Sequence, residues 1–558
     1  MPIVFAELQM SIGTQFVNDK RIPHMQHLGC SDFTLVAVVG ILTVLAFRKI
    51  LRKAGYNSQM RYTATLAVVA TVVSIAMRTA SAQTGGGAIF SRDHWLTDYS
   101  YLKHELERRY SHLAWFGSAQ SGVELPALDR ATRNSLEHAR TNAEAASAIT
   151  AFVAAFHDAH LVPKVVPMPL SPASAEPPFV ESAADACTAG AAFGYAPVTR
   201  IACSLPFESL PGFRLLSDGM TSAFRSGVIE QDSLRICIVR IPRFRPIEFP
   251  QVCESAWNSL TAQGITPSRT AVLVIVDAEW LRTLAVRLRE CGDRKVSALI
   301  VDVGGNAGGN DLGDWAVRLF TGKPVHSAPL LLSADSVAIP YFDEQLAGLR
   351  DALNANADLS GTSRTALERA MEGFHQCQEA AARKPCDMSW VWSEQRPWGG
   401  SSCSRLIPSG FSSGWLDYAD PGSIDPRVAG ALFWPVIADS FRGAWTGPTY
   451  VLTDSTTGSA AEMFAALMRD RGIAKTIGTH THGLGCGFMS SDVPLVLPYS
   501  KLSFAVPSCV RLRGDGTDEV AGIAPDLPTL AQPFETARSV AARALHMVAS
   551  DLVSNKGQ

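Results

Sequence analysis

The segment from Tyr450 to Phe488, YVLTDSTTGSAAEMFAALMRDRGIAKTIGTHTHGLGCGF, decides the fold. Its apolar start (450–452) predicts a short buried strand, and a small polar turn (453–458) leads into a helix that begins at Ser459. This joint displays the serine hydroxyl at a helix N-terminus. Unpaired backbone N–H groups and the helix dipole can stabilise a negatively charged oxygen there. Ser459 is therefore a candidate nucleophile.

The same residues also have a purely structural interpretation. Ser459 and Glu462 have the spacing of a capping box, in which the serine caps the helix and the glutamate reaches back to the serine backbone. Capping serines are common at helix N-termini. Other parts of the chain must therefore decide between cap and nucleophile.

Composition limits the classes of function. The chain has 558 residues, enough for two or three domains with large cores. Its net charge is -3 and it has no basic stripe, so nothing in the sequence predicts nucleic-acid binding. We expect the partners to be proteins, peptides or small molecules.

Two apolar runs precede the folded region, at residues 33–47 and 64–77. Both are shorter than the roughly 20 residues that a membrane-spanning helix needs. The second run follows the basic start Met60-Arg61 and precedes the small residues Ala80-Ser81-Ala82. This pattern is typical of a secretory signal peptide over residues 60–82.

A signal peptide at this place predicts a Sec-type route to the periplasm or the medium, with Gln83 as the first mature residue. Residues 1–59 are then a doubtful N-terminal extension. The alternative is an uncleaved hairpin over residues 33–77 that holds the protein at a membrane. The N-terminal sequence of the exported protein distinguishes the two: Gln83 supports cleavage, and an intact Met1 contradicts it.

The number of cysteines is consistent with an exported protein. Of the eleven, only Cys30 precedes the expected cleavage site, and an even number remains. Such a count in an exported chain predicts disulfides. Spacing makes Cys187 with Cys203, and Cys377 with Cys386, attractive local pairs, although sequence alone does not fix the connectivity.

The periodic patterns divide the mature chain into regions. Residues 83–165 predict an N-terminal helical domain, and the Pro-, Ala- and Ser-rich residues 166–234 fit either a linker or a small β module. Alternating helix and buried-strand patterns over residues 235–545 predict an α/β core, with residues 335–445 as an insertion. Ligands of such cores bind at the carboxyl ends of the strands.

A glycine-rich turn, GGNAGGND (304–311), follows one buried strand of this core. It contains neither phosphate-binding fingerprint, so we expect no nucleotide cofactor. His480 and His482 have a spacing that can bind a metal from a strand, but no carboxylate or third ligand lies near them in sequence. We expect no metal. Asp302 and Asp470 are interpreted as structural residues at element ends.

Four separated segments resemble the C-terminal processing peptidase family, which includes the tail-specific proteases and the tricorn core. They are HDAHLV (157–162), LIVDVGGNAGG (299–309), the serine segment (450–470) and DEVAGIAPD (518–526), in the order that the family has them. The resemblance implies a crotonase/ClpP-like spiral β/α core with an N-terminal helical domain. It also implies peptide-bond hydrolysis without a cofactor.

In this family Ser459 matches the nucleophile. The lysine that serves as base in the tail-specific branch matches Leu484, which cannot accept a proton, and Lys475 lies in a predicted strand. The tricorn-like branch uses a histidine and a glutamate, which match His160 and Glu519 here. The resemblance therefore implies a Ser-His-Glu arrangement.

The resemblance also implies an oxyanion hole formed by the backbone N–H groups of Gly308 and Ala460. The glycine loop departs from the family, with Gly304 in place of an arginine and Ala307 in place of a glycine. Ala159 stands where tricorn-like relatives have a serine that contacts the glutamate. Whether Glu519 reaches the histidine directly or through water is therefore open, and His157 is a second candidate base that fits the motif less well.

We thus expect an exported serine endopeptidase acting on protein or peptide substrates through an acyl-enzyme. The alternative is a catalytically inactive peptide- or ligand-binding protein on the same fold, since a fold does not fix a function. The altered glycine loop and the long insertion favour this alternative. Substrate preference and oligomeric state are not indicated by the sequence.

Overall fold

A computed structural model describes residues 89–164, 204–265, 269–383, 386–399, 405–410, 423–432, 436–489 and 494–556. Most of them belong to one compact unit made of Ser91–Ala139 and Ala145–Gln558. The described residues Ile89, Phe90 and Arg140–Glu144 are assigned to a second unit. The predicted signal peptide, the extension before it and the Cys187–Cys203 pair lie outside the described residues.

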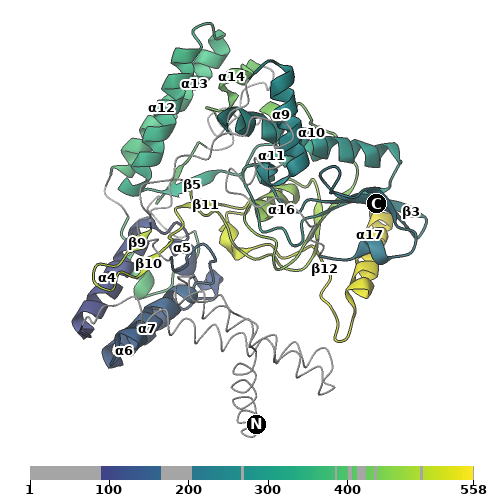
Figure 1. The fold of residues 1–558 in the computed structure, drawn as a ribbon. Coiled ribbons are helices and arrows are strands. Elements are labelled where there is room, and N and C mark those ends of the chain that lie inside the picture. The colour runs from purple at the N-terminus through teal and green to yellow at the C-terminus, as the bar shows by residue number, and fades with distance from the viewer. Residues whose placement is uncertain are drawn as a thin grey trace, which may run out of the picture. The chain divides into compact units, whose positions relative to one another are not determined.

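The larger unit is built on a central sheet of seven strands (Figure 1). In spatial order these are β1 (Arg214–Ser217), β2 (Ser226–Gln231), β3 (Leu234–Arg240), β4 (Ala298–Asp302), β7 (Thr449–Thr453), β8 (Lys475–Gly478) and β12 (Leu527–Pro528). The strands from β3 to β12 are parallel to their neighbours, whereas β1 and β2 are antiparallel. The expectation of an α/β core is confirmed, and its central sheet is mostly parallel.

Both faces of the sheet are covered, which explains the continuous apolar runs of β4 and β7. Alternate residues point to opposite faces, so Val301 and Val451 enter one core while Ile300 and Leu452 enter the other. The first core contains residues of α9 (Pro250–Ala262), α10 (Arg269–Asp293), α11 (Leu312–Trp315) and α16 (Ala460–Asp470). The second contains residues of η3 (Phe207–Ser209) and α17 (Ala537–Lys556).

The weakly patterned region before residue 235 contributes to this sheet. Its described part includes β1 and β2, and β2 pairs with β3 over its whole length. Four buried residues at the start of β2 pack it into the core, although its sequence SGVIEQ has little apolar character. Tertiary pairing thus overrides a weak local propensity.

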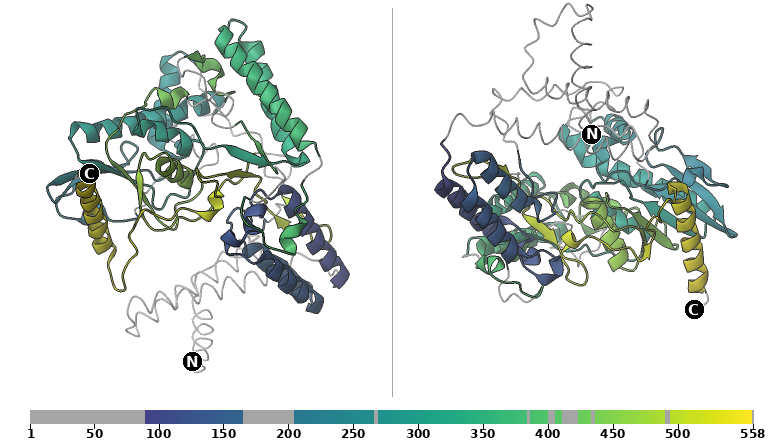
Figure 2. Two further views of the ribbon diagram at one scale, coloured as in Figure 1. Left: turned by 180° about the vertical axis from the view of Figure 1, so that it is seen from behind. Right: turned by 90° about the horizontal axis from the view of Figure 1, so that it is seen from below.

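The N-terminal helices are α4 (Arg92–Arg109), α5 (Leu113–Phe116), α6 (Leu125–His138) and α7 (Asn142–Ala154). Ser91 caps α4 by accepting the His94 N–H. Aromatic side chains pack α4 against the following helices, with the Tyr99 ring edge-on to Phe152 at 5.1 Å. Figure 2 shows α4 and α6 at the end of this unit that is remote from α17.

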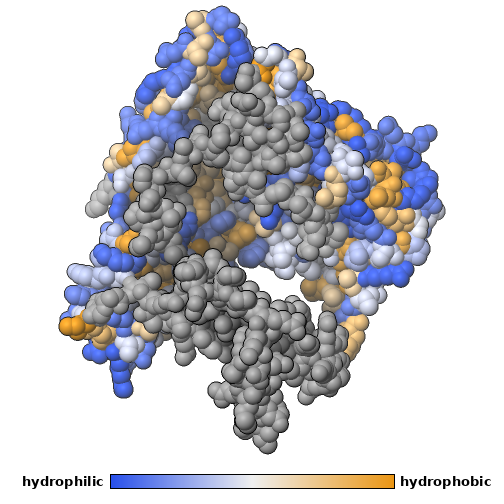
Figure 3. Space-filling view, viewed as in Figure 1, coloured by the Kyte–Doolittle hydropathy of each residue, from blue (hydrophilic) through white to orange (hydrophobic). Residues whose placement is uncertain are grey.

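Residues of the predicted insertion form a helical hairpin of α12 (Ile339–Ala355) and α13 (Gly361–Ala381) with its own apolar core. The outward surface of this hairpin is largely hydrophilic (Figure 3). A three-stranded sheet lies at its base, in which β5 (Leu330–Ser333) pairs with both β6 (Leu406–Pro408) and β11 (Cys509–Arg511). The hairpin is thereby connected to the segment that precedes Glu519.

The remaining elements are short. They are η1 (Ala119–Ser121), η4 (Pro246–Glu248), η5 (Ala316–Phe320), η6 (Ser336–Ala338), η7 (Ser389–Trp392), α14 (Pro426–Ala429), α15 (Val436–Asp439), β9 (Leu495–Val496), β10 (Ser503–Phe504) and η10 (Glu519–Ala521). None of the helices in the described ranges is long and apolar enough to cross a membrane.

Disulfides join Cys237 to Cys291 and Cys486 to Cys509. The expected Cys377–Cys386 pair is wrong. Cys377 is a free thiol buried on the face of α13 that packs into the hairpin core, whereas Cys386 takes part in another disulfide. Nearness in sequence failed because the helix directs Cys377 into the apolar core.

Candidate active site

The serine turn and the glycine loop follow two neighbouring parallel strands. Asp302 at the end of β4 pairs with Leu452 of β7, so the two loops leave the same edge of the sheet. They are also bonded to each other. The Gly458 N–H donates to the Asn306 carbonyl at 3.0 Å, and the Thr457 hydroxyl donates to the Val303 carbonyl at 3.0 Å.

Ser459 lies between the serine turn and α16 and is half-buried. Its φ of 51° and ψ of -121° are unusual for a residue with a side chain. An ordinary N-cap residue has an extended backbone instead. Ser459 therefore combines the position of a cap with a strained conformation of the kind that clusters at functional sites.

Gly308 packs directly against this serine. A Cβ atom at Gly308 would lie 2.7 Å from Ser459 Cβ and 3.0 Å from the Ala460 nitrogen, and its φ is +111°, so only glycine fits. The Ala460 N–H has no acceptor among the described residues. The Gly308 N–H, in contrast, donates to Asn306 Oδ1 at 2.8 Å. Both expected oxyanion donors flank the serine, and one of them is engaged.

Glu462 does more than cap the helix. Its carboxylate is 3% exposed and accepts the Ser459 N–H at 3.0 Å, as the capping box predicts. It also accepts the Gly483 N–H at 2.6 Å and the Leu484 N–H at 2.9 Å. Glu462 thereby joins the backbone of Ser459 to the segment GLGCG, which we call the 483–487 loop.

His160 is bonded to the 483–487 loop as well. Its Nδ1 lies 2.8 Å from the Leu484 carbonyl oxygen. Because a carbonyl can only accept, Nδ1 carries the proton and Nε2 keeps its basic lone pair. The ring also lies against Gly487 and meets the Phe488 ring edge-on at 5.9 Å.

The backbone of His160 is anchored through Asp158. This carboxylate accepts the His160 N–H at 2.8 Å and the Tyr110 hydroxyl at 2.8 Å. In the described part of the chain no hydrogen bond joins His160 to Ser459. The two residues are instead linked through Glu462 and the 483–487 loop.

Leu484 occupies the position that matches the lysine base of the tail-specific branch. Its side chain presses on Gly458, where an added Cβ would lie 2.3 Å from Leu484 Cδ1. Lys475 extends to Asp551, with 2.6 Å between Nζ and Oδ1. Neither side chain therefore supplies a base beside Ser459.

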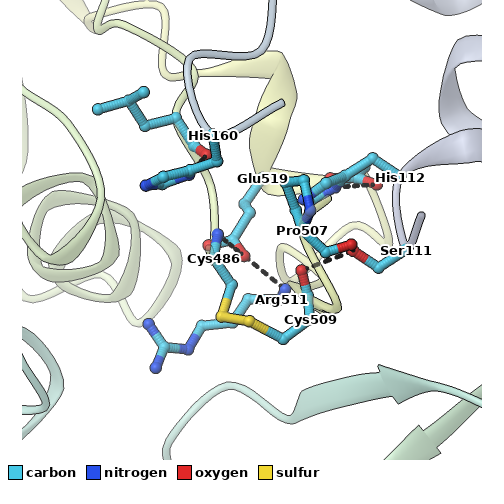
Figure 4. Close-up of a disulfide and its surroundings, with 10 residues drawn as sticks. Ser111, His112, His160, Cys486, Pro507, Cys509, Arg511 and Glu519 are labelled. Atoms are coloured by element: carbon cyan, nitrogen blue, oxygen red, sulfur yellow. Dashed lines mark hydrogen bonds and ion pairs between the residues drawn. A yellow bond between two sulfur atoms is a disulfide. The ribbon is translucent and has the colours of Figure 1, made fainter. Parts of the chain in front are cut away.

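Glu519 is the first residue of η10 and is 8% exposed. Its Oε1 accepts the Cys486 N–H at 2.7 Å and the Arg511 N–H at 2.6 Å (Figure 4). Figure 4 shows the His160 ring turned away from this carboxylate. Within the described ranges no hydrogen bond or ion pair joins Glu519 to His160. Glu519 therefore acts on the backbone of the 483–487 loop.

Burial raises the pKa of Glu519 to about 7, although the Arg511 guanidinium and the His112 ring both lower it. Asp518 raises it further by repulsion. The carboxyl group is thus poised between its neutral and charged forms near neutral pH.

The other candidate residues are placed away from this arrangement. His157 is exposed, and His480 Nδ1 bonds to the neighbouring Thr481 carbonyl. No group of three or more His, Cys, Asp or Glu side chains that could hold a metal occurs in the part of the chain that the structure describes. The expected structural aspartates are ion-paired, Asp302 with Arg240 and Asp470 with Arg513.

Sequence reasoning missed two residues of this region, His112 and Asp518. Asp518 lies in the segment DEVAGIAPD, where it accompanies Glu519. His112 lies between α4 and α5 in a stretch with no motif, so no sequence signal marks it. It becomes visible only because the fold brings it to within 2.8 Å of Asp518.

Comparison with known families identifies part of this region. Residues 415–529 match Peptidase family S41. The matched S41 segment contains the serine turn, α16, the 483–487 loop and Glu519, but neither His160 nor the glycine loop. The match supports the prediction of a serine-type peptidase.

Solved structures with a similar fold include mature CPAF, at 13% identity and a TM-score of 0.49, covering 84% of this chain and 99% of that chain. A putative peptidase from Parabacteroides merdae is 13% identical with a TM-score of 0.36, and the match covers 82% of this chain and 96% of that chain. The photosystem II D1 C-terminal processing protease is 12% identical with a TM-score of 0.29, and the match covers 79% of this chain and 93% of that chain. At these values they assign no residue roles. No curated protein sequence shows significant similarity.

Proposed function

We propose that this protein is an exported serine endopeptidase in which Ser459 is the nucleophile and His160 is the general base. The observation that carries the proposal is the bond from His160 Nδ1–H to the Leu484 carbonyl, which leaves Nε2 free to accept a proton. The same 483–487 loop is held by Glu462, which also holds the Ser459 backbone.

In the proposed reaction, His160 Nε2 takes the proton of the Ser459 hydroxyl as the oxygen attacks the peptide carbonyl. The imidazolium then returns the proton to the leaving amine, and a water molecule hydrolyses the acyl-enzyme by the same steps in reverse. The Leu484 carbonyl fixes the ring and its tautomer, as a carboxylate does in other triads. Glu519 contributes indirectly, by holding the backbone at Cys486.

The oxyanion would be stabilised by the Ala460 N–H at the start of α16 and by the Gly308 N–H. The second donor becomes available only when the Asn306 side chain releases it. Substrate binding therefore requires a rotation of the Asn306 side chain in this proposal. Such a step is typical of sites that complete their geometry as the substrate binds.

The location and the finer family assignment belong to the same proposal. Disulfides such as Cys486–Cys509 persist in oxidising compartments, which supports export to the periplasm or the medium. The use of His160 and Glu519 in place of a lysine favours the tricorn-like branch and its spiral core. Substrates would be proteins or peptides, with no nucleotide or metal.

A fluorophosphonate probe tests the proposal without knowledge of the substrate. The wild-type protein should gain the mass of one adduct, and peptide mapping should locate it on Ser459. The variant Ser459→Ala should not be labelled. Ser455→Ala, which removes an exposed hydroxyl from the same turn, should label like the wild type. Failure of the wild type to label in its folded form, or labelling at another residue, would refute the assignment.

One observation favours a different function, a non-catalytic peptide-binding protein on the same fold. The Gly308 N–H is occupied by Asn306 Oδ1, so the oxyanion hole is incomplete as the chain is folded. A binding protein would bind peptides with unchanged affinity in Ser459→Ala and would show no adduct in the wild type. The labelling experiment therefore separates the two functions.

A further inference from the structure

A second histidine is buried beside the candidate site. His112 lies between α4 and α5 and has no exposed surface. Its Nδ1 lies 2.8 Å and 3.0 Å from the two carboxylate oxygens of Asp518, which is 1% exposed. Asp518 also caps η10 by accepting the Val520 N–H at 3.0 Å. The pair thus fixes the start of the helix on which Glu519 is the first residue.

Asp518 determines the charge of this histidine. Burial is the largest single effect and lowers the pKa of His112, but the charge and hydrogen bond of Asp518, together with the charges of Asp158 and Glu519, outweigh it and raise this pKa to about 9. The Tyr110 ring also lies against His112, with ring centroids 5.7 Å apart. His112 therefore carries a positive charge at neutral pH.

The free side of the imidazolium lies near Glu519. His112 Nε2 is buried and has no hydrogen-bond partner among the described residues. A Cβ atom at Gly485 would lie 3.5 Å from this nitrogen and 3.1 Å from Glu519 Cγ, so both side chains pack on the same glycine. The positive charge lowers the pKa of Glu519, as does the Arg511 guanidinium, whereas Asp518 raises it.

The ionisation of Glu519 matters for the 483–487 loop. An ionised carboxylate accepts backbone N–H groups about twice as strongly as a neutral acid does. Glu519 Oε1 accepts the Cys486 N–H, two residues after the Leu484 carbonyl that bonds to His160. Loss of the charge would loosen the loop that orients the base.

We propose that His112 is a positioning residue: its imidazolium, paired with Asp518, favours the ionised form of Glu519, and Glu519 in turn holds the 483–487 loop that orients His160. This role rests on the proposed function, because it acts through the base of the peptidase. It places a residue of the N-terminal helical region in control of the pH range over which the site works.

The pH dependence of fluorophosphonate labelling at Ser459 tests this role in the full chain. His112→Asn keeps a donor toward Asp518 but removes the positive charge, so the acid limb of the labelling rate should move to higher pH by about one unit. The double variant His112→Asn/Asp518→Asn removes both charges, and its acid limb should lie between those of the wild type and the single variant. All three proteins should reach similar rates at high pH.

The outcomes separate the two proposals. A wild-type protein that does not label refutes the proposed function itself. Labelling with an unshifted acid limb in His112→Asn, or an equal loss of rate at every pH, overturns the role of His112 and leaves the peptidase intact.

A measurement on the wild type covers the case in which His112→Asn does not fold. With histidine carbon-13 labelled at Cε1, one resonance should keep its imidazolium shift up to a pH of about 9. If every histidine is neutral by pH 8, the proposal fails.

Discussion

The proposed nucleophile and the proposed base of the candidate site are positioned in different ways. Ser459 follows β7, an interior strand of the sheet, and Glu462, three residues later, holds its backbone. His160 comes from the N-terminal region, and its ring is fixed by the Leu484 carbonyl, 324 residues away in sequence. The first position results from local structure on a rigid sheet, and the second from a few long-range bonds to one loop.

Because of this difference, we expect substitutions around Ser459 and substitutions around His160 to have different effects on stability and labelling. Changes to the sheet or α16 should affect stability and the nucleophile together. Changes around the 483–487 loop should affect the base while the sheet stays folded. Three predictions test this comparison, and each uses the labelling rate of Ser459 together with the free energy of unfolding.

The largest effect is expected for His160→Ala. Loss of a general base typically lowers a rate by about 10²- to 10⁴-fold, while stability should change little because His160 is only half-buried. His157→Asn is the matched control, because His157 is exposed and asparagine tolerates its φ of 55°. Equal labelling of both variants would show that His160 is not the base.

An intermediate effect is expected for Glu462→Gln. The amide keeps the shape but loses the charge that three backbone N–H groups share, so the free energy of unfolding should fall by about 1–3 kcal/mol. The labelling rate should fall about tenfold, equivalent to ~1.4 kcal/mol. Glu344→Gln on the exposed surface of α12 is the control and should change neither quantity. A Glu462→Gln protein that is labelled as fast as the control would contradict the proposed link between Ser459 and His160 through Glu462.

The smallest effect on the labelling rate is expected from removal of a disulfide. Here the disulfide of the 483–487 loop can be compared directly with the disulfide that joins β3 to α10. Replacing both cysteines by serine should cost about 3.5 kcal/mol for Cys486–Cys509 and about 4 kcal/mol for Cys237–Cys291, since their sequence separations are 23 and 54 residues. Only the first replacement should lower the labelling rate, because Cys486 lies in the 483–487 loop. Urea unfolding measures stability, and labelling is compared under conditions in which both variants are folded. An equal loss of labelling in both would contradict separate control of the base.

The sequence predicted the local structure around Ser459 well. Continuous apolar runs identified β4 and β7, and the spacing of Ser459 and Glu462 identified the start of α16. These signals are local, so they can be recognised without knowledge of the tertiary structure. The same rule placed the glycine loop and the serine turn at one edge of the sheet, where the structure has them.

The residues around the proposed base were predicted only through the family resemblance. His160 and Glu519 were named from their motifs, but no pattern shows that Glu519 bonds to the Cys486 and Arg511 backbones. Those bonds depend on how the chain folds around Glu519, which brings the backbones of Cys486 and Arg511 to one carboxylate. His112 had no motif at all, and the strands β1 and β2 were hidden because tertiary pairing, not propensity, forms them.

The most direct test of the account is a crystal structure of the protein with a phosphonate adduct. The account predicts the phosphorus on Ser459 Oγ, its oxygen bonded to the Ala460 N–H and the Gly308 N–H, and His160 Nε2 within hydrogen-bond distance of Ser459 Oγ. Asn306 should have released Gly308. An adduct on Ser459 with His160 remote from it, or an adduct on another residue, would contradict the assignment of nucleophile and base.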